Sequence, residues 1–240
     1  MRIEGVTALV TGANRGLGRA FTRVLLERGA TVYAGARKPE DVTEPGVIPV
    51  RLDITDPEQV AAVAARCGEV ALLINNAACA TRSPLVATPT LGAARLEMET
   101  NYFGTLSMCR AFAPVLARNG GGALVNMGSI VSFFNNGSMG SFCATKAALW
   151  SMTNGLRVEL RPQQTLVVSA HSGFIDTELA AGFDVPKHDP RAVAAGILDA
   201  VETGREEVLY DEATRAMKAA LPDDLELIYP EVERQWLARA

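Results

Sequence analysis

The segment TGANRGLG, residues 11–18, decides the fold, because it joins a strand-like run to a helix-like run. The apolar run VTALVTG (6–12) leads into it, and GLGRAFTRVLLERG (16–29) follows with helical periodicity. Three glycines in the loop allow a tight turn and a close approach to the backbone. The free N–H groups and the positive dipole end of the following helix attract a phosphate. We therefore predict a dinucleotide-binding loop, although a glycine loop by itself also fits an ordinary strand-to-helix turn.

The rest of the chain continues the alternation of strands and helices. Further strands are expected within 31–36, 47–55, 70–77, 121–129, 165–173 and 206–211, and further helices over 57–67, roughly 93–118, 140–160 and 190–204. Apolar strands that alternate with amphipathic helices indicate a mostly parallel sheet with helices on both faces. Right-handed crossovers then give a doubly wound α/β fold of the Rossmann type. We see no linker and no repeat, so residues 1–240 are predicted to form a single dinucleotide-binding domain that includes loop 176–189 and tail 221–240.

Composition excludes several classes of function. The chain has 240 residues, of which 48% are hydrophobic and 21% charged, and its net charge is −4. These values argue against a nucleic-acid partner or an anionic membrane. No signal-peptide pattern or spanning run is evident, so a cytoplasmic location is expected. The two histidines lack zinc-site spacing, so no metal site is predicted. We expect free thiols at the four cysteines, Cys67, Cys79, Cys109 and Cys143.

The segment after the second strand bears on the choice of cofactor. An acid at this point would bind the adenosine ribose and repel a 2′-phosphate, but the sequence YAGARK (33–38) has none. Instead Arg37 and Lys38 stand there, and Arg15 lies in the glycine loop. The three cations favour NADP(H) over NAD(H), because an arginine fork suits a phosphate. The alternative is that they are solvated surface charges.

Several motifs together resemble the short-chain dehydrogenase/reductase family. They are the T-G-x-x-x-G-x-G loop, NNAA (75–78) after the fourth strand, and Ser129 about a dozen residues ahead of FCATK (142–146). The resemblance covers residues 3–211. It implies a seven-stranded sheet, hydride transfer to or from a nicotinamide, a small-molecule carbonyl or alcohol substrate, and a homodimer or homotetramer.

The resemblance also implies residues that hold the cofactor. The glycines line the pyrophosphate, Asp53 and Ile54 contact adenine, and NNAA supports the sheet and the ribose. The segment HSGFIDT (171–177) closes on the nicotinamide. Two departures are that the NNAA motif ends in Ala78 rather than glycine, and that Ser172 replaces a frequent proline. The candidate cofactor-binding residues are Gly12, Asn14, Arg15, Gly16, Leu17, Gly18, Arg37, Lys38, Asp53, Ile54, Asn75, Ala77, Lys146, Ser172, Gly173, Ile175 and Thr177.

Four positions correspond to the catalytic groups of the family. Asn101 is placed like the asparagine that orders a proton-relay water, and Ser129 like the serine that binds the substrate carbonyl. Lys146 matches the lysine that holds the nicotinamide ribose and lowers the pKa of a tyrosine. That tyrosine position is occupied by Phe142. The structural alternatives are a helix cap or bend for Asn101, a strand-end serine, and a surface lysine.

Phe142 raises the main question about function. Positions 142 and 146 lie on one helix face, but a phenylalanine ring can neither donate nor accept a proton. The expected consequence is impaired carbonyl–alcohol chemistry with cofactor binding retained. Three interpretations stay open: an engineered Tyr→Phe variant, a natural enzyme with another proton source, and a natural NADP(H)-binding protein without redox turnover, such as a sensor or a subunit partner. Ser141 and Cys143 point about 100° away on a helix and are poor replacements.

The sequence also suggests a substrate pocket and an interface. The pocket is expected between residues 129–136, the start of helix 140–160, and loop 176–189, which has the character of a mobile lid. Phe133, Phe134 and Met139 either line it or pack beneath it. Helices 93–118 and 140–160 carry more apolar surface than one sheet face needs, and the family's counterparts form a dimer interface.

Overall fold

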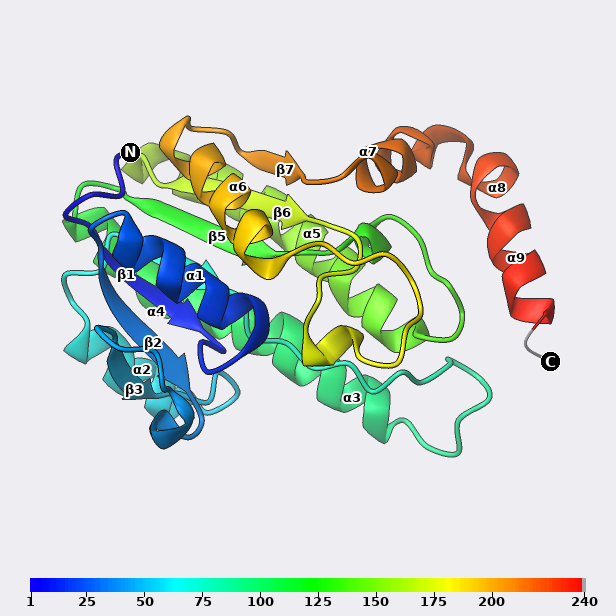
Figure 1. Ribbon diagram of the computed structural model, residues 1–240, viewed down its shortest axis with the longest axis horizontal. Coiled ribbons are helices and arrows are strands. Elements are labelled where there is room, and N and C mark those ends of the chain that lie inside the picture. The colour runs from blue at the N-terminus through cyan, green and yellow to red at the C-terminus, as the bar shows by residue number, and fades with distance from the viewer. Residues whose placement is uncertain (239–240) are drawn as a thin grey trace.

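Seven parallel strands form the central sheet of the computed structural model, which describes residues 1–238. The strands are β1 (Thr7–Thr11), β2 (Thr31–Ala36), β3 (Ile48–Arg51), β4 (Leu72–Asn75), β5 (Ala123–Met127), β6 (Leu166–His171) and β7 (Glu207–Leu209). Their order is β3-β2-β1-β4-β5-β6-β7, and every pair is parallel. The predicted Rossmann-type fold is confirmed, and the sheet is wholly rather than mostly parallel (Figure 1).

Helices cover both faces of the sheet. They are α1 (Gly16–Glu27), α2 (Pro57–Arg66), α3 (Gly92–Met98), α4 (Thr105–Arg118), α5 (Gly140–Leu160), α6 (Pro190–Glu202), α7 (Glu212–Ala219), α8 (Asp224–Leu227) and α9 (Tyr229–Leu237). Apolar side chains of α1 and α6 form one core with the sheet. Those of α2, α4 and α5 form a second core on the opposite face. Two buried layers explain why the strands read as continuous apolar runs.

The expected helix over 93–118 contains a π-helical turn. It runs as α3, then the π segment η2 (Glu99–Gly104), then α4. Gly104 permits this path beside the sheet, because a Cβ there would lie 2.8 Å from Cγ1 of Ile54. π turns inside helices are frequent at functional sites, and this one contains Asn101.

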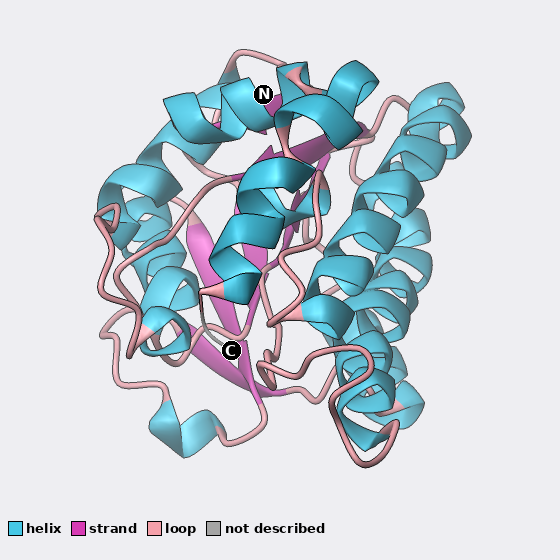
Figure 2. Cartoon of the chain, turned by 90° about the vertical axis from the view of Figure 1, so that its right-hand side faces the viewer, coloured by secondary structure: helices cyan, strands magenta, loops and turns pink. Residues whose placement is uncertain are grey.

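Loop 176–189 and helices α7, α8 and α9 lie beyond the carboxyl ends of the strands (Figures 1 and 2). Loop 176–189 contains the short 3₁₀ turn η5 (Glu178–Ala180) and a bridge between Ile175 and His188. The tail, of mixed character in the sequence, forms α8 and α9. Among residues 1–238, no helix is both long and apolar enough to span a bilayer. The cytoplasmic location and the single-domain organisation stay predictions.

Candidate functional site

The carboxyl edge of the sheet collects most of the candidate residues. Gly12 follows β1, Arg37 follows β2, and Asn76 follows β4, while Ser129 and Ser172 lie just past β5 and β6. β1 and β4 are neighbours, although β1 continues along the chain into β2 on its other side. This reversal of strand order is where ligands bind in doubly wound sheets. The view in Figure 2 looks onto this end of the molecule.

The glycine loop has the shape that the sequence predicts. Gly12 and Gly16 have φ values of 64° and 52°, which favour glycine. A Cβ on Gly18 would lie 2.1 Å from the carbonyl oxygen of Gly12, so only glycine fits there. Asn76 Nδ2 donates to the carbonyl oxygen of Thr11 at 2.9 Å, and the Asn76 N–H donates to Thr11 Oγ1 at 3.0 Å. Sequence reasoning named Asn75 and Ala77 but missed Asn76, which ties the loop to β4.

The surroundings of this loop fit an anionic dinucleotide. Leu17 is buried under the loop, whereas Asn14 is half-buried and Arg15 exposed at the cap of α1, where no side chain bonds the first N–H groups. Arg37 and Lys38 are also exposed, and none of the three cations forms an ion pair within residues 1–238. Free N–H donors and free cations are what phosphates require.

The adenine candidates lie next to the π turn. Asp53 Oδ1 accepts from the Thr55 N–H at 3.0 Å and from Thr55 Oγ1 at 2.7 Å. This turn leaves Ile54 buried against Gly104. Asp53 is half-buried, so one edge of this pair stays accessible at the end of β3.

Asn75 supports the sheet from within. Its Nδ2 donates to Asn126 Oδ1 at 2.9 Å, and Asn126 Nδ2 donates to Thr153 Oγ1 at 3.0 Å. These bonds link β4, β5 and α5 through buried polar groups. Buried amides that are bonded in this way fix neighbouring elements relative to one another.

A polar ladder joins α3 and η2 to α5; we define it as the pairs Glu97–Ser141 and Asn101–Thr145. Ser141 Oγ donates to Glu97 Oε2 at 2.5 Å, and Asn101 Nδ2 donates to Thr145 Oγ1 at 3.0 Å. Both pairs have i, i+4 spacing on both helices, so the rungs align. All four residues are buried. The ladder fixes the start of α5, where positions 142 and 146 lie.

Asn101 has a second task that the sequence did not reveal. Its Oδ1 accepts from the Cys79 N–H and its Nδ2 donates to the Cys79 carbonyl, both at 2.9 Å. Its side chain is therefore engaged with the loop after β4 and with Thr145, and no direct bond joins it to Lys146 among the described residues. The expected water-ordering role stays a prediction.

Lys146 and Phe142 lie together in the interior. Lys146 Nζ donates to the carbonyl oxygen of Met127 at 2.8 Å and lies 5.6 Å from the centroid of the Phe142 ring. Both side chains are buried, so Lys146 is not the surface lysine of the alternative interpretation. Burial lowers the pKa of the Lys146 ammonium to about 8. The Phe142 ring packs with Val131, Met139 and Cys143.

Ser129 lies two residues beyond Met127, at the start of a 3₁₀ turn. Its Oγ accepts from the Val131 N–H at 3.3 Å, and its own N–H donates to Ser132 Oγ at 3.2 Å. The hydroxyl proton of Ser129 has no acceptor among the described residues and stays available to a ligand. Ser129 is half-buried, so it is both a structural cap and an accessible donor.

His171 is a buried residue to which sequence reasoning gave no role. Its Nε2 lies 2.7 Å from Ser169 Oγ, and its Nδ1 lies 3.1 Å from the Ser129 carbonyl oxygen. Burial lowers the pKa of the imidazole to about 4, so the ring is neutral at pH 7. Phe133 packs on His171, with ring centroids 4.7 Å apart, and is buried. Phe133 is therefore packed in the interior under the segment 129–136 and does not line the expected substrate pocket.

The segment after β6 lies against the glycine loop. A Cβ on Gly16 would lie 3.2 Å from the Thr177 side chain and 3.5 Å from Glu178 Oε2. Ser172 Oγ donates to the Gly173 carbonyl at 3.1 Å, and the Gly173 N–H donates to Asp211 Oδ2 at 2.7 Å. Ile175 forms its bridge with His188. The structure thus brings Thr177 to the predicted pyrophosphate site.

Comparison with known proteins agrees with this geometry. The family model for short chain dehydrogenase matches residues 6–186. Sorbitol dehydrogenase of Cereibacter sphaeroides is 34% identical over 195 residues, covering 77% of this chain and 76% of that protein. The 3-oxoacyl-(acyl-carrier-protein) reductase FabG of Escherichia coli K12 is 32% identical over 215 residues, covering 85% of each chain.

Solved structures give the same result. A short chain dehydrogenase from Burkholderia cenocepacia J2315, in complex with NADP, is 44% identical, with a TM-score of 0.92 over 97% of this chain and 99% of that one. An enzyme from Burkholderia phymatum, in complex with NAD, is 24% identical, with a TM-score of 0.84 over 95% and 96%, and shows the shared fold alone.

The chain belongs to the short-chain dehydrogenase family. It is accordingly an oxidoreductase of the class that acts on a carbonyl or an alcohol with a nicotinamide cofactor.

Proposed function

We propose that this protein is an NADP(H)-dependent oxidoreductase that interconverts a small carbonyl compound and an alcohol, and that Phe142 impairs its proton transfer. The observation that carries the cofactor preference is a set of three exposed cations, Arg15, Arg37 and Lys38, which form no ion pair within the described part of the chain. They accompany a second strand that lacks a terminal acid. A 44% identical relative that was solved with NADP supports it.

The residues of the chain divide the chemical work. When bound, the nicotinamide supplies or accepts the hydride. Lys146 presents a buried positive charge at the end of β5. Ser129 provides a hydroxyl donor for a substrate oxygen on which negative charge develops. Asp53, Ile54, Ala77, Ser172, Gly173, Ile175 and Thr177 are proposed to line the cofactor.

Phe142 provides no proton donor at the position where a tyrosine hydroxyl would lie. Its ring is buried within 5.6 Å of Lys146 Nζ, where a phenol would meet the ammonium. A positioned acid or base contributes typically about 10²–10⁴-fold to a rate. The same observation favours one alternative, namely an NADP(H)-binding protein that does not turn over.

A titration tests the cofactor assignment. NADPH and NADH are titrated by fluorescence into the parent chain and into Arg37→Ala, with Arg118→Ala as a matched exposed arginine on α4. Arg37→Ala is expected to weaken NADPH binding by about tenfold or more, the effect of one charge-assisted contact, and to leave NADH binding unchanged. Equal effects on both cofactors would contradict the assignment of a 2′-phosphate site.

A turnover assay tests the activity. NADPH oxidation is followed with a panel of ketones and aldehydes, and NADP⁺ reduction with secondary alcohols, for the parent chain and for Phe142→Tyr. Turnover by either protein supports the oxidoreductase. Tight NADPH binding without turnover by either would reject it for this panel and favour the non-redox alternative.

We also propose that the protein forms a homo-oligomer, at least a dimer, through α4 and α5. Phe103 beside α4 is 51% exposed and Val158 on α5 is 74% exposed. A hollow of about 460 Å³ lies next to Phe103, between Val60 of α2 and Leu106 of α4. A second copy of the chain would cover these apolar groups.

A further inference from the structure

Arg82 has an unusual backbone. Its φ of 56° is in the left-handed region, which only one other described non-glycine residue, Gln164, shares. Gln164 ends a short 3₁₀ turn, a common place for this conformation. Arg82 has no such local reason, and a non-glycine residue held there costs energy that the surroundings must supply.

Two buried residues hold the chain in this conformation. Asn101 binds both backbone groups of Cys79 at 2.9 Å. Glu97 accepts from the Thr81 N–H at 2.5 Å and from Thr81 Oγ1 at 2.8 Å. Glu97 is 0% exposed and Asn101 is 1% exposed, so the anchors are themselves fixed by the ladder to α5. The backbone that leads into Arg82 is therefore anchored on both sides of Ala80, while the Arg82 residue itself is exposed.

The guanidinium of Arg82 lies against loop 176–189. Arg82 Nη2 donates to the carbonyl oxygens of Leu179 at 3.1 Å and Ala181 at 2.5 Å. The guanidinium carbon lies 4.5 Å from the centroid of the Phe183 ring. One side chain from the segment after β4 thus makes three contacts with the loop after β6. Charge-assisted bonds and a cation–π contact are individually modest and act here on one turn.

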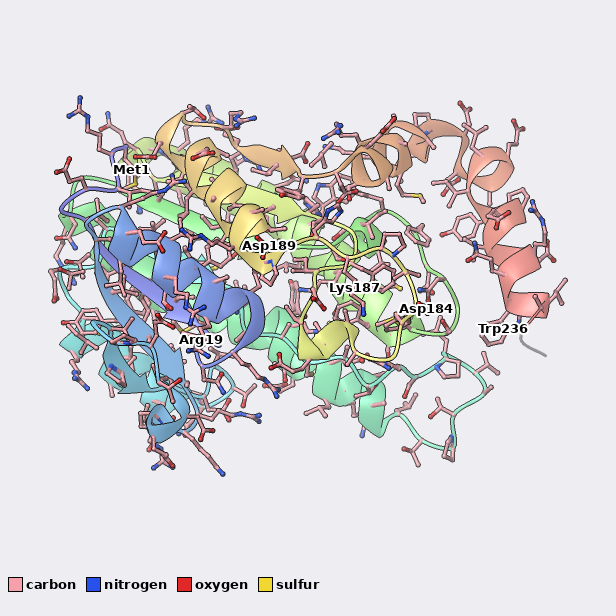
Figure 3. All side chains as sticks on the ribbon, in the orientation of Figure 1. Met1, Arg19, Asp184, Lys187, Asp189 and Trp236 are labelled. Carbon is pink, nitrogen blue, oxygen red and sulfur yellow. The ribbon has the colours of Figure 1, made fainter. Side chains whose placement is uncertain are left out.

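The loop is tied at its base by backbone bonds and by the side chain of His188, whose Nε2 lies 3.4 Å from Asp211 Oδ2. The His188 N–H donates to the Phe174 carbonyl at 2.8 Å, and the Asp176 N–H donates to the His188 carbonyl at 2.9 Å. Between these ties residues 184–186 are exposed. Figure 3 labels Asp184 and Lys187 on this loop. Arg82 binds the turn η5 and Phe183 to the segment after β4. Phe183 also packs against Phe174 and against the buried cluster that contains Phe142.

We propose that Arg82 is a positioning residue that latches loop 176–189 over the cofactor cleft and sets the rate at which the cleft opens. The loop places Thr177 and Glu178 next to Gly16, and we therefore expect ligand exchange at the glycine loop to depend on movement of loop 176–189. The link to cofactor exchange rests on the proposed function. The latch itself does not, because its contacts involve only this chain.

Native-state proteolysis tests the latch without any ligand. Trypsin cleavage after Lys187, within the loop, is followed by mass spectrometry in the full-length parent, Arg82→Met, Arg82→Gly and Phe183→Leu. Arg95→Met, an exposed arginine of α3, is the matched control. Cleavage is expected to be about tenfold faster in both Arg82 variants, because opening of the loop exposes the bond. Phe183→Leu is expected to show a smaller increase, and Arg95→Met none.

The design separates a structural defect from the latch. Arg82→Gly relaxes the positive φ while removing the side chain, so faster cleavage in a folded Arg82→Gly protein reports the lost contacts. Unchanged cleavage in both Arg82 variants would overturn the proposal.

Cofactor kinetics provide the second readout. Stopped-flow NADPH dissociation is expected to accelerate in the Arg82 variants with a smaller change in the dissociation constant, because association accelerates too. If the dissociation constant instead rises by the same factor as the dissociation rate, while the association rate is unchanged, Arg82 contacts the cofactor directly. That result would contradict a latch. Failure of the parent chain to bind NADPH would instead reject the proposed function and leave the cleavage result intact.

Discussion

At the scale of single residues, Lys146 shows how the fold tunes a group. The sequence placed this lysine four positions after Phe142, and that spacing predicted a shared helix face. The structure adds the burial, which lowers the pKa of the ammonium to about 8 from an ordinary 10.5. Among residues 1–238 its one hydrogen-bond partner is the Met127 carbonyl at 2.8 Å. The buried charge is therefore a cost to folding.

This cost predicts a pH-dependent stability difference. Between pH 8 and 10.5 the unfolded chain binds more protons at Lys146 than the folded chain does, so the free energy of unfolding rises with pH in this window. Lys146→Met is expected to be more stable than the parent at pH 7, by on the order of 1–3 kcal/mol. The advantage should shrink toward zero near pH 10.5.

Urea denaturation at pH 7, 8, 9 and 10 measures this difference. Lys38→Met, at an exposed lysine, is the control and should show no trend. A stability advantage of Lys146→Met that is constant across the series would contradict the lowered pKa.

At the scale of elements, the glycine loop has the tightest packing constraint. Gly18 lies in the first turn of α1, and its Cβ position is 2.1 Å from the Gly12 carbonyl oxygen. Gly18→Ala must push the loop away from α1. We expect a loss of about 2 kcal/mol or more in unfolding free energy, the range of overpacking, together with loss of NADPH binding.

Gly155 offers a matched control within another helix. It lies in α5, and a Cβ there would have nothing within 4 Å. Gly155→Ala is expected to stabilise the protein by about 0.5–1 kcal/mol, because alanine is the better helix former. Thermal unfolding measures the stability of both variants, and NADPH titration measures their cofactor binding. A Gly18→Ala protein that binds NADPH normally would contradict the role of the loop.

What the sequence could predict at this scale depends on how local the cause is. Helix α5 spans Gly140–Leu160 as expected, and Asp56 caps α2 by accepting from the N–H groups of Glu58 and Gln59. Both depend on neighbouring residues. The contacts of Asn76 and Glu97 were missed, because their partners are far away in the sequence. Asn76 binds Thr11, 65 positions away, and Glu97 binds Ser141, 44 positions away. No local pattern predicts such contacts before the topology is known.

At the scale of the whole molecule, the proposed dimer interface rests on exposed apolar groups of η2 and α5. Phe103→Asp would place a charge in the proposed interface and is expected to raise the dimer dissociation constant by at least about 30-fold, the effect of losing a central anchor. Sedimentation velocity measures it. Leu227→Asp, at another exposed apolar residue on α8, is the control. Equal effects of both substitutions, or a monomeric parent chain, would contradict an interface on α4 and α5.

The whole arrangement supports one central proposal: the chain is an oxidoreductase in which Phe142 occupies the position of the proton donor. The sheet, the glycine loop, Ser129 and Lys146 meet at the carboxyl edge, and Phe142 occupies the remaining position beside Lys146. The sequence could predict this juxtaposition, because it follows from motifs at fixed spacing. It could not predict the burial of Lys146 or the ladder that fixes α5, since both depend on packing between distant segments.

The most direct measurement is kcat/KM for NADPH-dependent ketone reduction by Phe142→Tyr relative to the parent chain, after equal NADPH affinity has been confirmed. The claim predicts a gain of about 10²–10⁴-fold, the worth of a positioned general acid. Similar, measurable rates in both proteins would contradict it, since the proton would then come from another group, and Ser129 would be the first residue to replace.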